Sequence, residues 1–171
     1  GECHEHSRSF GYSGCPDRER GQWWGDVVID LGEAFYAFDR RSDAIIHKGL
    51  CELAAWQRPD GTMFSPIPAG NYDVELAPQI LATVGYYGAW TYYFNTGDSA
   101  TIRRIYPAIK KYLYLWKMGP DGLTIRRTGK WDWEEWGQNI DAPLLDNAWY
   151  VIALKSAIGM AHVVGADNDI A

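Results

Sequence analysis

The chain has 171 residues, 47% of them hydrophobic, which suits one ordinary folded domain with a buried core and argues against disorder. Its formal net charge of −6 argues against nonspecific binding to nucleic acid or to an acidic membrane, and short basic clusters such as Arg126-Arg127 are expected to be solvated surface. The surplus of 9 Trp and 11 Tyr suits recognition of ligands with apolar faces and polar edges.

The N-terminal segment carries little chemistry that can be predicted. Cys3, Cys15 and Cys51 have no paired spacing, so no disulfide framework is expected. The run 3–6, CHEH, superficially resembles a metal cluster, but adjacent residues cannot easily converge on one ion. We expect no metal site and a flexible or irregular segment over residues 1–13. Any signal peptide was removed or never present, which leaves the compartment open, with a periplasmic or secreted location slightly favoured.

The pattern of apolar residues predicts an almost wholly helical chain. A first helix over about 25–38 is apolar on most sides, and a second is expected over about 42–57. A Gly- and Pro-rich loop over 58–73 separates it from a third helix, over about 74–95. This third helix has no charge from Ala77 through Asn95, but Pro78, Gln79 and its tyrosines argue against a membrane span. We expect a helix buried on all sides.

The fourth helix, over about 98–118, has a different pattern. Ile102, Ile105 and Ile109 form an apolar stripe, whereas the basic residues lie off it, so one face is expected on the core. Asp98 is the expected N-cap, and Pro107 should kink or split the helix. The segment 119–130 predicts a small hairpin, and a fifth helix follows over about 143–164.

This order of helices predicts an all-α fold of the α/α toroid type, in which inner and outer helices alternate. A wholly buried helix is followed by an amphipathic one, and long loops bearing Trp, Asp, Glu and Pro follow the other helix ends. A plain helical bundle is the alternative. Six helix pairs need roughly twice this length. We therefore expect residues 1–171 to be a single domain containing about the first half of a toroid.

Residues 14–26, GCPDRERGQWWGD, combine carboxylates with adjacent tryptophans. Glycosidic bond hydrolysis needs one carboxylic acid and a second carboxylate, and burial against Trp raises the pKa of such an acid. Glu19, with Asp17 and Asp26 nearby, has these ingredients. A salt-bridged turn held by Arg18 or Arg20 at the start of the first helix is an equally good interpretation of the residue types.

A second stretch, WDWEEW over 131–136, repeats this combination. Trp rings stack on the C–H faces of sugars, and carboxylates accept hydrogen bonds from sugar hydroxyls. A Trp-rich turn packed against the domain is the alternative. The presence of two such stretches on loops favours a sugar site.

Residues 15–20, CPDRER, followed by 23–26, WWGD, resemble the signature at the start of the catalytic (α/α)6 barrel of family 78 glycoside hydrolases, the α-L-rhamnosidases. The resemblance extends from about Tyr12 to Ala166 and so covers most of the chain. It continues through AWQRPDG at 55–61, FSPIPAGNY at 64–72, GYYGAW at 85–90, YFNTGD at 93–98, YPAIKKYL at 106–113 and WDWEEWG at 131–137.

The resemblance implies a role for each matched position. Glu19 corresponds to the general acid and Arg18 is its neighbour, Asp26 binds or orients the sugar, and Trp23 lines the pocket. Trp133 and Trp136 are expected to add sugar stacking. The family inverts configuration, and its general base belongs to a later helix, so the remainder of the barrel is expected C-terminal to this chain.

One departure from the family is Gly14, where an Asp that binds sugar hydroxyls is usual. The expected substrate is a rhamnose-containing glycan or glycoside. No cofactor is expected, because two carboxylates suffice for the hydrolysis. The rival interpretation is a catalytically incomplete sugar-binding relative that keeps the Trp stacking.

Overall fold

The computed structural model describes residues 20–68, 73–127 and 137–170, and within these ranges the chain is mainly helical. None of the helices in these ranges is both long and apolar enough to cross a membrane. The elements in chain order are β1 (Gln22–Trp23), α1 (Trp24–Ala37), the 3-10 turn η1 (Arg40–Ser42), α2 (Asp43–Ala55), β2 (Pro66–Ile67), α3 (Ala77–Val84), the π-helical turn η2 (Tyr86–Trp90), α4 (Thr91–Thr96), α5 (Ser99–Leu113), α6 (Ala142–Val164) and the 3-10 turn η3 (Asp167–Ile170).

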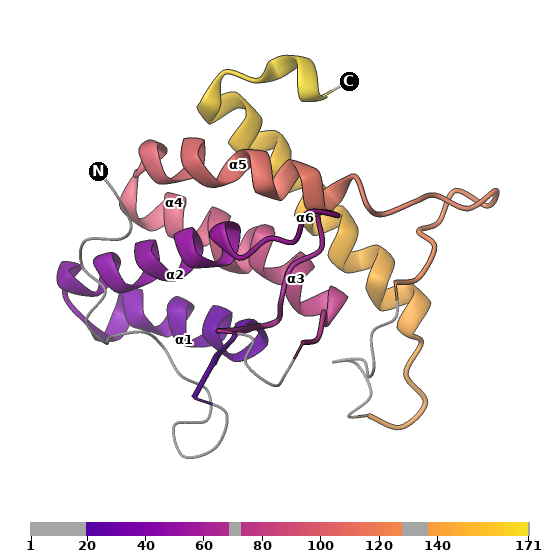
Figure 1. Cartoon of the computed structure of the whole chain (residues 1–171), viewed down its shortest axis with the longest axis horizontal. Helices are drawn as coiled ribbons and strands as arrows, with labels where there is room; N and C mark the ends of the chain where they lie inside the picture. Colours follow the sequence, from indigo (N-terminus) through magenta and orange to yellow (C-terminus); the bar gives the residue numbers. More distant parts are fainter. Residues whose placement is uncertain (1–19, 69–72, 128–136, 171) are drawn as a thin grey trace.

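The helices form antiparallel pairs, in which α1, the α3–α4 segment and α6 run in one general direction and α2 and α5 return in the other (Figure 1). Among the first set, α1 packs on α3 and α3 packs on α6, whereas α2 packs on α5. The predicted all-α fold with alternating helices is therefore confirmed. We refer to α1, the α3–α4 segment and α6 as the inner helices.

In helix α1, the apolar residues at helical spacing are the ones that pack in the core. Trp24, Val28 and Leu31 recur every three or four residues and are at most 4% exposed. Burial of one such aliphatic side chain is worth roughly 1.5–3 kcal/mol. Asp26 lies in the first turn, where a negative charge interacts favourably with the helix dipole.

The third predicted helix is divided by Gly85, whose φ of −96° and ψ of −135° interrupt the helix between α3 and η2. All of α3 is buried, as predicted. Beyond the break the prediction of burial on all sides is wrong, because Tyr86 is 51% and Phe94 is 81% exposed. The π-helical turn adds a residue to its turn, which changes the directions in which the following side chains point.

Helix α5 matches its predicted pattern. Ile102, Ile105 and Ile109 are at most 3% exposed, and the Asp98 side chain accepts from the N–H groups of Ala100 and Thr101 at the N-cap. Pro107 lies inside the helix without splitting it, contrary to one of the two expected outcomes. Pro107 is exposed, so water can hydrogen-bond to the backbone carbonyl of the preceding turn, which has no N–H partner at this position.

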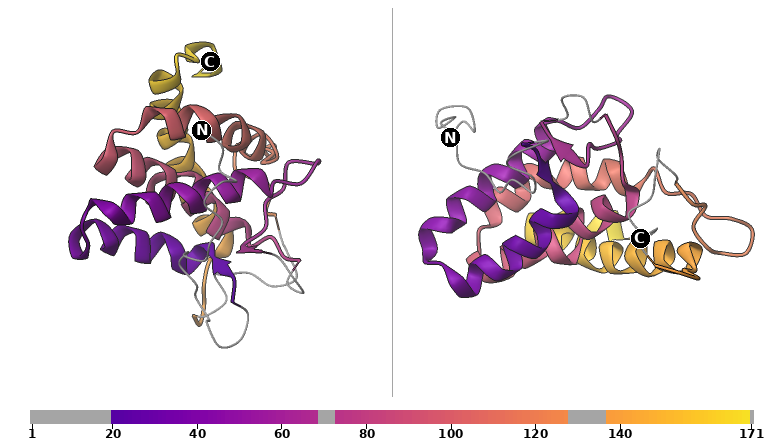
Figure 2. Two further views of the ribbon diagram at one scale, coloured as in Figure 1. Left: turned by 60° about the vertical axis from the view of Figure 1, so that its left-hand side comes forward. Right: turned by 90° about the horizontal axis from the view of Figure 1, so that it is seen from below.

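The segment between α5 and α6 contains the predicted hairpin, which extends beyond the helices (Figures 1 and 2). Met118 pairs with Thr124, and the Ile125 N–H donates to the Lys117 carbonyl at 2.7 Å. Gly122 at the turn has a φ of 78°, a conformation that glycine adopts at little cost. Helix α6 then begins at an Asp141 cap and ends at Gly165, whose φ is 75°.

Candidate active site

The loops that precede the three inner helices are joined at one end of the molecule. The first junction is the two-residue antiparallel pairing of β1 with β2, in which Gln22 is opposite Ile67 and Trp23 is opposite Pro66. The N–H of Trp24, at the start of α1, also donates to the Ser65 carbonyl at 3.0 Å. The loop before α1 and the loop before α3 are therefore one structural unit.

Ser65 organises the second of these loops. It is fully buried, its N–H donates to the Val74 carbonyl at 2.9 Å, and its Oγ accepts from the Leu76 N–H at 2.7 Å. These bonds close the segment 65–76 just before α3, although residues 69–72 lie outside the described ranges. The described ends of this segment therefore lie beside the N-terminus of α1.

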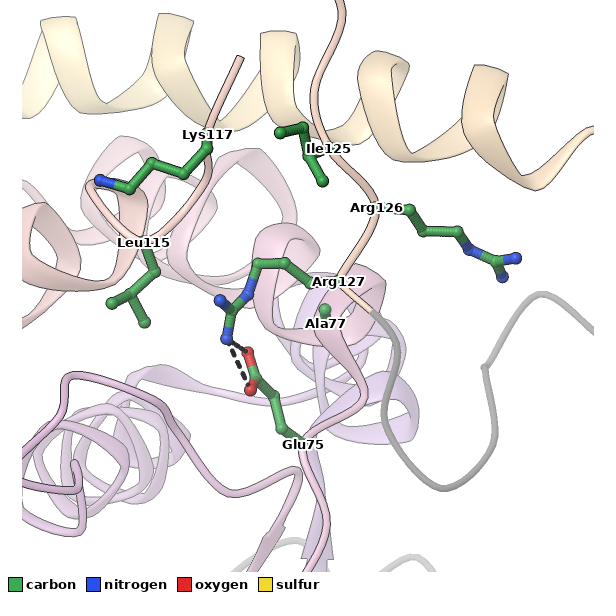
Figure 3. Close-up of a pocket in the computed structure, with 7 residues that line it drawn as sticks. All are labelled: Glu75, Ala77, Leu115, Lys117, Ile125, Arg126 and Arg127. Atoms are coloured by element: carbon green, nitrogen blue, oxygen red, sulfur yellow. Dashed lines mark hydrogen bonds and ion pairs between the residues drawn. The ribbon is translucent and has the colours of Figure 1, made fainter. Parts of the chain in front are cut away.

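Glu75 joins the third loop to the other two (Figure 3). The Arg127 guanidinium donates through Nη2 to both oxygens of Glu75, at 3.0 and 2.9 Å. The Tyr112 hydroxyl donates to Glu75 Oε1 at 2.9 Å, and burial followed by the nearby Glu75 charge raises the pKa of Tyr112 well above its usual value. The expectation that Arg127 would be solvated surface is wrong, because this carboxylate draws it inward.

A face of α1 presents three carboxylates at successive turns, from Asp26 and Asp30 to Glu33. Asp26 is exposed as a residue, but partial burial of its carboxyl raises its pKa. For Asp30, burial is again the main cause of a raised pKa, and the charges of Asp26 and Glu33 add to it. The carboxyls of Asp26 and Asp30 are therefore more readily protonated than those of ordinary aspartates.

The structure places two of the predicted site residues. Asp26 lies at the exposed N-terminal end of α1, adjacent to the loop junction. Trp23 is only 8% exposed and packs in a small cluster with Val74 and Leu76, so it forms a wall between the first two loops. The predicted site residues Arg18, Glu19, Trp133 and Trp136 lie outside the described ranges.

Three other carboxylates near this end of the molecule are occupied by structural contacts. Asp73 is paired with Arg58, Glu75 is held by Arg127 and Tyr112, and Asp141 caps α6 by accepting from the Leu144 N–H at 3.1 Å. A carboxylate that is already paired or capping is a poor candidate for activating water. Glu134 and Glu135 lie outside the described ranges.

Sequence reasoning missed a further charged residue in this region. Asp146 lies in the second turn of α6, is 1% exposed and has Arg126 Nε 3.5 Å from its Oδ2. The available signal was an aspartate within an otherwise apolar helical run, which predicts a partnered buried charge. Together, Arg126 and Arg127 bind one carboxylate of α6 and one of the loop before α3.

A pocket of about 320 Å³ opens beside the Glu75–Arg127 ion pair. Its walls come from the end of the α3 loop, the segment after α5 and the segment before α6, namely Glu75, Ala77, Leu115, Lys117, Ile125, Arg126 and Arg127 (Figure 3). Over residues 20–68, 73–127 and 137–170, no three His, Cys, Asp or Glu side chains are grouped to hold a metal ion.

Comparison with known protein families matches residues 11–171 to the bacterial alpha-L-rhamnosidase six-hairpin glycosidase domain. Neither a curated protein nor a solved structure matches the chain. The family match spans the described helices and the loops that join at their N-terminal ends.

Proposed function

Because the chain belongs to the bacterial alpha-L-rhamnosidase six-hairpin glycosidase domain family, we propose that it hydrolyses terminal α-L-rhamnosyl bonds of plant or microbial glycans with inversion of configuration. The family indicates glycoside hydrolase chemistry. The observation that supports a site in this chain is the junction of the three loops before α1, α3 and α6. It brings Asp26 and the residues flanking both carboxylate–tryptophan stretches to one end.

In this proposal Glu19 is the general acid and Arg18 orients it. Asp26 binds sugar hydroxyls from the end of α1, where partial burial raises the pKa of its carboxyl. Glu19 is three positions before Gln22 of β1 in the sequence, and this short separation supports the proposal. Trp133 and Trp136 contribute stacking, and Trp23 is a buried wall packed against Val74 and Leu76 of the loop before α3.

The second carboxylate of an inverting enzyme has to lie about 6.5–9.5 Å from the acid, with room for water. We propose that it comes from helices that complete the barrel beyond α6. The exposed face of α6 supports this, because Leu144 is 64%, Val151 49% and Ile158 42% exposed along one side of that helix. An inner helix with such a face needs a neighbour to cover it.

The test compares the 171-residue chain with the same domain completed by its later helices, using an aryl α-L-rhamnoside. We expect the chain by itself to show little or no turnover and the completed domain to be active. In the completed domain, Glu19→Gln should abolish most turnover and leave rhamnose binding largely intact, because the amide keeps the shape but cannot deliver the proton.

Two results would contradict this proposal. Robust turnover by the 171 residues would remove the need for a later base, and full activity of the Glu19→Gln domain would exclude Glu19 as the acid. Rhamnose binding without turnover in the completed domain would instead favour the sugar-binding relative. In that case Gly14→Asp is the variant to examine, because it restores the usual family residue.

A further inference from the structure

The row of inner helices has two open sides. Helix α3 packs on α1 and on α6, so α1 and α6 are the end members of this row (Figures 1 and 2). The family to which the chain belongs has six helical hairpins, and each hairpin of an α/α toroid supplies one inner helix. The three inner segments of this chain are therefore half of such a ring, and one side of α1 and one side of α6 have no neighbouring inner helix.

The open side of α6 is mainly apolar. The exposed side chains of Leu144, Val151 and Ile158 recur every seven residues, which places them on one side of the helix. Lys155 is exposed on the same side and makes no ion pair or hydrogen bond with a described residue. A side that is apolar and carries an unpaired cation fits a partner that is apolar and negatively charged.

The open side of α1 has this complementary composition. Ile29 and Tyr36 are 57% and 94% exposed, and Glu33 lies between them at helical spacing. Within the described part of the chain, Glu33 makes no ion pair or hydrogen bond. Burial, followed by the charges of Asp26 and Glu33, raises the pKa of Asp30 on the same helix. A cation facing this side would offset the repulsion between these carboxylates.

Close contacts between the inner segments define which residues are level along the helices. A Cβ built on Gly25 of α1 would touch the side chain of Gln79 in α3, and a Cβ built on Gly85 would touch Ala153 of α6. Gln79 and Gly85 are six positions apart, and the three segments run in the same general direction. Gly25 is therefore at about the level of Asn147, the residue six positions before Ala153.

The exposed residues of the two open sides are level with one another. A rotation about an axis parallel to the inner helices leaves these levels unchanged, so they also hold between two copies of the chain. Counting from Gly25 and Asn147 gives an apolar pair, a charged pair and a second apolar pair, namely Ile29 with Val151, Glu33 with Lys155 and Tyr36 with Ile158. The spacing of the residues along the two helices is identical.

We propose that two copies of this chain associate around a two-fold axis parallel to the inner helices, with α6 of each copy packed against α1 of the other. The two contacts are then equivalent, and the dimer has the six inner helices of a complete ring. In a domain completed by later helices, those helices occupy the same open sides. The association is therefore a property of the 171-residue chain and does not require the proposed hydrolysis.

The test measures the mass of the 171-residue chain by sedimentation equilibrium. At concentrations up to about 100 µM we expect a reversible dimer of twice 19.3 kDa. Val151→Asp should weaken dimerisation at least about tenfold, because it places a carboxylate opposite the acidic side of α1. Leu123→Asp is the matched control, since Leu123 lies on the hairpin, away from both open sides, and is about as exposed as Val151. It should leave the dimer Kd unchanged.

Charge reversal tests the predicted pair directly. Lys155→Glu and Glu33→Lys should each weaken the dimer at least about tenfold, because each change creates like charges at both equivalent contacts. The double variant should restore the Kd to within about threefold of the parent. All of these side chains are exposed in the single chain, and circular dichroism checks that each variant keeps its helices.

Several results would overturn the proposal. They are a monomer at every concentration, a series of species larger than a dimer, equal effects of Val151→Asp and Leu123→Asp, or a double variant that is as weak as the single variants. The hydrolysis assay on the completed domain is independent of this mass measurement. An active completed domain with a monomeric 171-residue chain would remove only the dimer, whereas a dimeric chain with an inactive completed domain would remove only the proposed function.

Discussion

Gly85, at the break in the α3–α4 segment, lies directly against Ala153 of α6. A Cβ built on Gly85 would be 2.8 Å from Ala153 Cα and 2.7 Å from the Leu81 carbonyl oxygen, closer than real contacts allow. The same pair of helices meets again where a Cβ on Gly159 would be 2.5 Å from Trp90 Cη2. The distance between these two inner helices is thus set by small residues, and the positions of their N-terminal loops depend on it.

We expect Gly85→Ala to destabilise the protein by about 1–3 kcal/mol, because the added methyl has backbone rather than flexible side chain in its path. Chemical denaturation monitored by circular dichroism measures this. Gly32→Ala in α1 is the control, since a Cβ added there would have no atom within 4 Å, and it should be neutral or stabilising by up to about 1 kcal/mol. Equal effects of the two variants would contradict the close approach of α3 and α6.

Glu75→Gln should cost about 2 kcal/mol of unfolding free energy, because Arg127 would remain partly buried without its carboxylate. Tyr112→Phe, which removes one donor to Glu75, should cost about 1 kcal/mol. Asp167→Asn, which breaks an exposed pair with His162, should change stability by less than about 0.5 kcal/mol. Urea titrations of the three variants test this order of unfolding free energies. An equal cost for Glu75→Gln and Asp167→Asn would show that the loop junction does not depend on the Glu75–Arg127 ion pair.

Asp98 is expected to make stability depend on pH in acid. Burial would raise the pKa of Asp98, but hydrogen bonds from Thr101 and Tyr92 outweigh it and hold the pKa below its usual 3.8. The stabilisation is therefore fully present above the unfolded pKa and is lost as the pH falls through the lower folded value.

Two variants of Asp98 distinguish the effect of its negative charge from the effect of its helix-capping hydrogen bonds. Asp98→Ala should cost about 1 kcal/mol at pH 7, with the difference shrinking below pH of about 4. Asp98→Asn keeps a capping side chain and should flatten the acid slope with a smaller loss at pH 7. Denaturation midpoints between pH of about 2 and 7 measure both effects. An unchanged slope in both variants would contradict the lowered pKa.

Asp30 should affect the pH dependence of stability in the opposite direction to Asp98. Its pKa is raised, first by burial and then by Asp26 and Glu33, so its charged form is disfavoured in the folded protein. Asp30→Asn should be more stable than the parent at pH 7, by less than about 1 kcal/mol because solvent screens these charges. The advantage should decline as the pH falls through the raised folded pKa and vanish below 3.8, where the folded and unfolded Asp are both protonated. A destabilised Asp30→Asn at pH 7 would contradict the crowding of carboxylates on α1.

Several elements can be predicted from short stretches of sequence because their causes are local. The Asp98 cap and the stripe of Ile102, Ile105 and Ile109 follow from hydrogen bonding and spacing within one helix, and the structure has both. The division of the third helix at Gly85 cannot be predicted in the same way. Whether a glycine interrupts an apolar helix depends on what packs against it, here Ala153, 68 positions later in the chain.

The candidate site likewise has features that local sequence predicts and features that depend on distant contacts. Residue types and spacing point to Asp26, to Trp23 and to the carboxylate–tryptophan stretches, because the chemistry needed for a sugar site is visible in a short segment. The pairing of Glu75 with Arg127 has no such local signal. A pair of adjacent arginines is compatible with solvent until a carboxylate 52 positions away is brought to it.

Periodicity and local motifs are enough to establish the helical class, most helix limits, the family resemblance and the residue types of a sugar site. Packing between distant segments establishes which loops meet, that Trp23 is a buried wall, that Glu75 serves as an anchor, and that a pocket opens beside it. These features depend on contacts between residues far apart in the chain, and such contacts exist only after the packing of α1, α3 and α6 has fixed the spacing of their ends.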